Sequence, residues 1–161
     1  MEQHYRVEFI YKGVSYYCIW YSSDHDYLIN QENRIEYFSA MRDLETYCLR
    51  NKLPLSKDDA AVYNLDEIET WLAGGKTRVD CKLILNVWNI FQDVAFSAKV
   101  LFSGNDKTYN GVYNKIFYGN NLPSINTSGK IYVPEWDEEE LQVISDVLEN
   151  GMQLFRKSLI S

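Results

Sequence analysis

The side chains of this 161-residue chain with the best capacity for chemistry are carboxylates and two histidines. Asp24-His25-Asp26 is the one place where a histidine stands among carboxylates, the combination that binds metals or transfers protons. In an extended segment alternate residues share a face, so both carboxylates would point away from His25. The flanking serines favour a solvated polar turn, and we assign this turn neither a metal nor a catalytic role. His4, near the start of the chain, receives no role either.

No pattern of nucleophilic catalysis is present in the sequence. It has no Gly-x-Ser-x-Gly motif, and no histidine stands in a recognisable signature with Cys18, Cys48 or Cys81. Each cysteine lies in an apolar pattern, which is typical of buried reduced thiols. Gly74-Gly75 lacks the strand-to-helix context of a phosphate-binding loop and indicates the end of a helix. We therefore expect no enzymatic activity, no metal and no cofactor.

The charge balance favours a binding protein. Asp and Glu number 23 against 16 Lys and Arg, a formal charge of -7, and the chain also has 13 tyrosines and 4 tryptophans. Binding nucleic acid directly needs clustered cations, so we do not expect a nucleic-acid ligand. An acidic protein instead attracts basic partners and speeds their encounter. The acidic clusters of the first half are Asp24, Asp26, Asp58, Asp59, Asp66, Glu67 and Glu69.

The elements that must position these carboxylates begin with strands. Apolar and polar residues alternate over 5–11 and again over 14–20, with Lys12-Gly13 between them, which predicts two strands joined by a tight hairpin. One or two further strands are expected over 27–29 and 34–38. The pattern predicts a small antiparallel meander of about three to four strands within a β-rich part, residues 1–38.

Helical spacing takes over from Ser39. It predicts about five helices in a helical part, residues 39–161. The helix over about 80–99 is apolar round most of its circumference and has a narrow polar stripe, which consists of Lys82, Asn86, Asn89 and Asp93. Such a helix is expected at the centre of the molecule with the others packed around it. The fold class is therefore α+β, in a single domain over residues 1–161.

Two helix starts carry recognisable caps. Asn64 and Glu67 have the spacing of a capping box, and so do Asp137 and Glu140. The second box accounts for the acidic run over 135–140, because acids in a first turn complement the helix dipole. The loop over 119–125 contains two asparagines whose amides are expected to bond the loop's own backbone, with a recognition loop as the alternative.

The chain shows no membrane or export signal. Its first residues lack the basic-then-apolar layout of a signal peptide, and polar residues interrupt the most apolar segment, 83–102. We expect a cytoplasmic protein that does not contact a membrane.

From about residue 36 onward the sequence resembles immunity proteins of bacterial polymorphic toxin systems, of the kind encoded beside contact-dependent growth inhibition toxins. The segments that carry the resemblance are YFSAMRDLETYC at 37–48, VYNLDEIETWL at 62–72, LNVWNIF at 85–91, YNKIFYGNNLP at 113–123 and PEW at 134–136. These families share no catalytic signature, so the resemblance assigns no role to an individual residue.

The resemblance implies a non-enzymatic inhibitor that binds and neutralises one cognate toxin domain. Such toxins are often nucleases with basic clefts, so we expect a basic nuclease domain as partner, covered by carboxylates in place of substrate phosphates. The toxin-binding residues that we expect are the seven acidic residues of the first half named above. Two alternatives remain: an adaptor or regulatory subunit of an intracellular complex, and a small carboxylate-based hydrolase.

Overall fold

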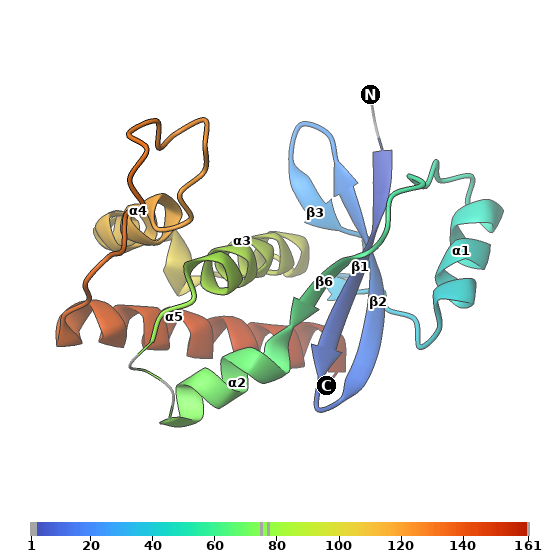
Figure 1. Cartoon of the computed structure of the whole chain (residues 1–161). Helices are drawn as coiled ribbons and strands as arrows, with labels where there is room; N and C mark the ends of the chain where they lie inside the picture. Colours follow the sequence, from blue (N-terminus) through green and yellow to red (C-terminus); the bar gives the residue numbers. More distant parts are fainter. Residues whose placement is uncertain (1–2, 75, 77, 161) are drawn as a thin grey trace.

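A four-stranded sheet and a long central helix, α3, lie beside each other in the computed structural model, which describes residues 3–74, 76 and 78–160 (Figure 1). The strand order is β3-β2-β1-β6, and β4 and β5 form a separate two-stranded sheet. The strands are β1 Gln3–Tyr11, β2 Val14–Ser22, β3 Asp26–Leu28, β4 Asn30–Gln31, β5 Arg34–Ile35 and β6 Ala61–Asn64. The α-helices are α1 Met41–Arg50, α2 Leu65–Gly74, α3 Cys81–Ala98, α4 Asn110–Tyr118 and α5 Glu138–Phe155. Short 3-10 turns at Ser103–Asn105 and Lys107–Tyr109 precede α4, and a π turn, Arg156–Ile160, follows α5. The α+β fold class is confirmed.

The predicted hairpin is present. Strands β1 and β2 pair antiparallel from Gln3 opposite Ser22 to Tyr11 opposite Val14. The two residues between them, Lys12 and Gly13, both have positive φ, at 51° and 71°. That conformation twists the hairpin in the same sense as its strands, and glycine adopts it without a steric penalty.

Strand β6 lies within the part of the chain that was expected to be helical. It pairs parallel with β1, from Val7 opposite Ala61 to Ile10 opposite Asn64, and makes the sheet mixed. A four-residue strand is too short to show a two-residue period, and a parallel partner can be distant in sequence. Its position places the acidic segment before it, Asp58-Asp59, at the edge of the sheet.

Helix α3 is the centre of the main core, as predicted. Val87, Trp88 and Phe91 are fully buried, and the helix contacts α5, α4, β3 and β5. It begins at the cap residue Asp80, whose side chain accepts a hydrogen bond from the Leu83 N–H, and it ends at Lys99 with φ 55°. Helix α1 lies on the opposite side of the sheet (Figure 1), where a second cluster buries Ile19, Leu44 and Cys48.

Of the two predicted capping boxes, the one that opens α5 is confirmed. The Glu140 N–H donates to Asp137 Oδ1 at 2.8 Å, and the Asp137 N–H donates to Glu140 Oε1 at 3.1 Å. At the start of α2 the Asn64 side chain accepts from the Asp66 N–H at 3.1 Å. Within the described residues Glu67 makes no reciprocal bond, so the box at α2 is incomplete. Among the described helices, none combines the length and apolar character needed to cross a bilayer.

Candidate functional site

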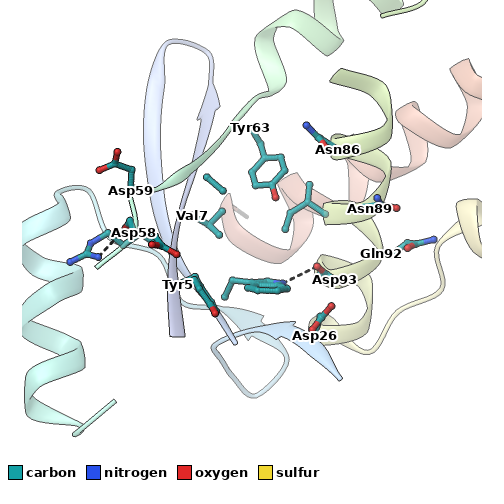
Figure 2. Close-up of a pocket in the computed structure, with 14 residues that line it drawn as sticks. Tyr5, Val7, Asp26, Asp58, Asp59, Tyr63, Asn86, Asn89, Gln92 and Asp93 are labelled. Carbon is teal, nitrogen blue, oxygen red and sulfur yellow. Dashed lines mark hydrogen bonds between the residues drawn. The ribbon is translucent and has the colours of Figure 1, made fainter. Parts of the chain in front are cut away.

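A cleft of about 520 Å³ lies between α3 and the sheet (Figure 2). On the sheet side β1 contributes Tyr5, Arg6 and Val7, and β2 contributes Trp20. The segment at the edge strand contributes Asp58, Asp59, Ala61 and Tyr63, and β3 contributes Asp26. On the helix side the lining residues are Asn86, Asn89, Ile90, Gln92 and Asp93. The volume is within the range of ligand-binding pockets.

The polar stripe of α3 accounts for much of the cleft's chemistry. Asn86, Asn89 and Asp93 recur at three- and four-residue spacing, so they share one face of an otherwise buried helix. That face lines the cleft (Figure 2). The Asn89 Oδ1 atom already accepts a hydrogen bond from the Tyr113 hydroxyl at 2.8 Å. The stripe is therefore the polar wall of a site, and Lys82, its fourth member, lies outside this cleft.

Asp93 is the most perturbed carboxylate of the cleft. It is half-buried, and the indole Nε1–H of Trp20 donates to its Oδ2 at 3.0 Å. Burial raises the pKa of Asp93 to about 6, the Trp20 hydrogen bond lowers it in part, and the negative charge of Asp26 raises it again. Across the cleft, burial and then the charge of Asp93 raise the pKa of Tyr63. A carboxylate perturbed by burial inside a cleft is a marker of a functional site.

Aromatic rings form the sheet side of the cleft beside this carboxylate. The rings of Tyr5 and Trp20, on neighbouring strands, have centroids 5.3 Å apart and planes tilted by 54°. The ring of Tyr63, on β6, packs against Phe9 with centroids 5.6 Å apart. Cross-strand aromatic pairs of this kind hold each ring in a fixed orientation. The cleft therefore combines rigid aromatic faces with acidic and amide groups.

Four of the seven predicted toxin-binding residues gather around this opening. Asp26, Asp58 and Asp59 line the cleft itself. Asp24 lines an adjoining hollow, which shares Asp26 and Asp93 with the cleft. All four of these predicted residues are exposed, so their charges face solvent. Clusters that are far apart in the sequence are thus brought to one region of the surface.

The other three predicted residues, on α2, lie outside the cleft, and two of them have internal partners. Asp66 accepts hydrogen bonds from the backbone N–H groups of Lys12 and Gly13, at 2.6 and 2.9 Å, and so holds the β1–β2 turn against α2. Glu69 pairs with Arg156 at 3.1 Å. Glu67 is exposed beside them. The structure gives Asp66 and Glu69 roles within the fold, while contact of all three with a partner stays a prediction.

Asp66→Ala is expected to lower the free energy of unfolding by about 1–3 kcal/mol, because two backbone N–H groups of the hairpin turn lose a charged acceptor. Urea denaturation at neutral pH measures the change. Glu67→Gln, on the same helix, is the control and should change the stability by less than about 0.5 kcal/mol. Equal stabilities of the two variants would contradict the structural role of Asp66.

The Asp24-His25-Asp26 turn is a polar turn in the structure. The His25 ring lies beside Phe96, with centroids 5.3 Å apart, and Asp26 accepts a hydrogen bond from Ser22 Oγ at 3.0 Å. In the part of the chain that the structure describes, no group of three or more His, Cys, Asp or Glu side chains is arranged to hold a metal ion.

The prediction that both asparagine amides bond the backbone of the loop over 119–125 holds only in part, since Asn121 bonds Gly119 and Tyr132, whereas Asn120 bonds Ile116 in α4 and Cys81 in α3. Asn121 Nδ2 donates to the Gly119 and Tyr132 carbonyls, and Asn121 Oδ1 accepts from the Tyr132 N–H at 2.7 Å. Asn120 Nδ2 donates to the Ile116 carbonyl at 3.0 Å. Gly119 has φ -64°, so it does not adopt a left-handed cap conformation; its small size is needed because a Cβ there would crowd Cys81 Sγ.

Comparison with known proteins identifies a similar fold. No family model and no curated protein matches the sequence. One solved structure, the SatS C-terminal domain in complex with bromine, is similar with a TM-score of 0.54 and 12% sequence identity. The match covers 97% of this chain and 92% of that one. The similarity is one of fold alone.

Proposed function

We propose that this protein is an immunity protein, a non-enzymatic inhibitor that binds the toxin domain of a contact-dependent growth inhibition system. The observation that carries the proposal is the convergence of carboxylates on one cleft: Asp26, Asp58, Asp59 and Asp93 line it, and Asp24 lies beside it. Together with the formal charge of -7, this arrangement favours a basic partner surface.

The one basic side chain that lines the cleft in the described chain is Arg6, and the protein itself engages its charge. Its Nη1 atom donates to the carbonyls of Ser56 and Asp58, and its Nη2 atom pairs with Glu45 at 3.2 Å. The guanidinium group therefore braces the segment that carries Asp58 and Asp59. The carboxylates around the cleft still outnumber it, so the local field is negative.

Such a surface suits inhibition of a nuclease by occlusion. Nucleases bind the phosphates of their substrate with clustered Lys and Arg. When no nucleic acid is bound, the carboxylates of an inhibitor can occupy the positions of those phosphates. Aromatic side chains at the centre of an interface supply much of the binding energy, which suits Tyr5 and Trp20. A nuclease toxin acts where nucleic acid is exposed, so this inhibitor would work in the cytoplasm.

Co-expression with the toxin domain encoded by the neighbouring gene tests the proposal directly. A 1:1 or higher-order complex should co-purify, and growth arrest by the toxin should be relieved. Toxin with an unrelated acidic protein of similar charge serves as the control. If the toxin domain neither co-purifies with this protein nor loses its toxicity, the proposal is wrong.

Removing the charges of Asp58 and Asp59 is expected to slow association with the toxin domain. In Asp58→Asn/Asp59→Asn the association rate should fall several-fold at low salt, and its dependence on salt should become shallower, because steering by these charges is lost. Stopped-flow or biosensor kinetics over a salt series measure both quantities. Glu138→Gln/Glu139→Gln, at the start of α5, carries the same charge change away from the cleft. Identical salt series for the two double variants would exclude the Asp58–Asp59 face.

A carboxylate-based hydrolase is the second candidate, and one observation favours it. Asp93, with a pKa raised to about 6, shares the cleft with Asp26, and a raised pKa is what a general acid needs near neutral pH. Hydrolysis of chromogenic glycosides near pH 6, lost in both Asp93→Asn and Asp26→Asn, would support this candidate over the inhibitor.

A further inference from the structure

Asp93 has acceptor capacity that the fold leaves unused. Trp20 Nε1 donates to Oδ2 at 3.0 Å, and no other hydrogen-bond donor among the described residues reaches the carboxylate. A carboxylate offers about four lone-pair positions. Half-burial limits the water that can fill the others, so a group with several N–H donors would recover the missing hydrogen bonds.

The surroundings of Asp93 favour a cation as the donor. Asp26 lines the same cleft, its negative charge raises the pKa of Asp93, and neither carboxylate takes part in a salt bridge among the described residues. The rings of Tyr5 and Trp20, whose centroids are 5.3 Å apart, both lie on the sheet side of the cleft. Rings of these types attract cations placed over their faces.

Two amide side chains extend the set of acceptors. Asn86 and Gln92, one on each side of Asn89 along α3, line the cleft and carry carbonyl oxygens that can accept hydrogen bonds. Between them, the Asn89 Oδ1 atom accepts a hydrogen bond from the Tyr113 hydroxyl, which holds the Asn89 side chain in place. The labelled side chains in Figure 2 show these residues following one helix opposite Tyr5 and Tyr63.

We propose that the cleft receives one guanidinium group, the end of an arginine side chain of the partner, between Asp93 and the rings of Tyr5 and Trp20. The inference deepens the proposed function and rests on it for the source of the arginine, a basic toxin domain. A planar guanidinium meets a carboxylate with two parallel hydrogen bonds and also stacks on an aromatic ring, which an ammonium group does not do. The cleft of about 520 Å³ is large enough to admit such a group with its stem.

A small-molecule probe tests the site without the toxin. N-acetyl-L-arginine amide is titrated into the ¹⁵N-labelled full chain, and N-acetyl-L-citrulline amide, nearly the same shape without the charge, is the comparison. The indole N–H signal of Trp20, assigned from its loss in Trp20→Phe, should shift with the arginine probe and saturate with a millimolar dissociation constant. In Asp93→Asn the affinity should fall at least about fivefold, which corresponds to the loss of one charge-assisted contact.

Control variants and probes distinguish binding at Asp93 from nonspecific attraction of a cationic probe to an acidic protein. Glu149→Gln removes one negative charge away from the cleft and should bind the probe as the wild type does. The proposal is overturned if citrulline amide shifts the Trp20 signal as strongly, if no shift occurs, or if Asp93→Asn and Glu149→Gln bind alike. N-acetyl-L-lysine amide binding equally well would overturn the choice of guanidinium.

Measuring how tightly the toxin domain binds the wild type and Asp93→Asn tests this inference separately from the proposed function. If the toxin domain binds the wild type and Asp93→Asn with equal affinity, the inhibitor proposal stands and the guanidinium site is wrong. If the arginine probe binds at Asp93 but no toxin domain binds, the site is supported and the inhibitor proposal fails. Both are supported only when Asp93→Asn weakens binding of the probe and of the toxin domain.

Discussion

Asp93→Asn is expected to make the protein more stable at pH 7, by about 1–2 kcal/mol after allowance for partial exposure of the carboxylate. In the folded protein burial raises the pKa of Asp93 to about 6, from an ordinary value of 3.8. Between these two pH values the folded state binds more protons than the unfolded state, so the free energy of unfolding falls as pH rises. Above about pH 6 the carboxylate of the wild type is ionised, and its partial burial lowers the free energy of unfolding. The neutral asparagine side chain carries no such penalty. Its amide oxygen can still accept the hydrogen bond from Trp20.

Urea denaturation of both proteins at pH 4 and pH 7 measures this effect. The two should have similar stabilities near pH 4 and should diverge as pH rises through 6. Asp59→Asn, at an exposed position of the same cleft, is the control and should change stability by less than about 0.5 kcal/mol at either pH. A constant difference between wild type and Asp93→Asn across this range would show that burial does not raise the pKa of Asp93.

This expected gain bears on function. A carboxylate that lowers stability is maintained where it does a task that a neutral side chain cannot do, because functional sites often trade stability for activity. Combined loss of binding and gain of stability in Asp93→Asn would be the signature of such a site. Loss of stability together with loss of binding would instead indicate a structural role.

Gly151→Ala is expected to lower the free energy of unfolding by about 1–3 kcal/mol, although alanine is the better helix former. Gly151 lies in α5 directly against α3, and a Cβ there would overlap the ring of Phe91. Phe91 is fully buried in the main core, so its ring has little room to move. The loss comes from overpacking at the contact between the two longest helices.

Gly111→Ala in α4 is the matched control with the opposite expected sign. No atom lies within 4 Å of a Cβ built at Gly111, so the substitution should raise stability by about 0.5 kcal/mol through reduced backbone entropy of the unfolded chain. Thermal and urea denaturation of both variants provide the comparison. If Gly151→Ala also raised stability, α3 and α5 would not be in the close contact described.

Much of the fold could be predicted because its signals are local. The alternation on either side of Lys12-Gly13 predicted the β1–β2 hairpin, and Asp137 with Glu140 predicted the start of α5. Central packing of α3 followed from its apolar circumference. Strand β6 could not be predicted, because its four residues owe their conformation to a parallel pairing with β1, about 50 residues earlier in the chain.

The site shows the same division. The sequence by itself determined an acidic, histidine-poor chain, and it located the acidic clusters and the polar stripe of α3. Only the tertiary structure decided that Asp26, Asp58 and Asp59 meet that stripe at one cleft, while Asp66 serves the β1–β2 turn. It also singled out Asp93, because desolvation and the charge of Asp26 depend on which surfaces pack around the carboxylate. Spacing along the chain fixes which face of a helix is polar, but long-range packing determines what that face meets.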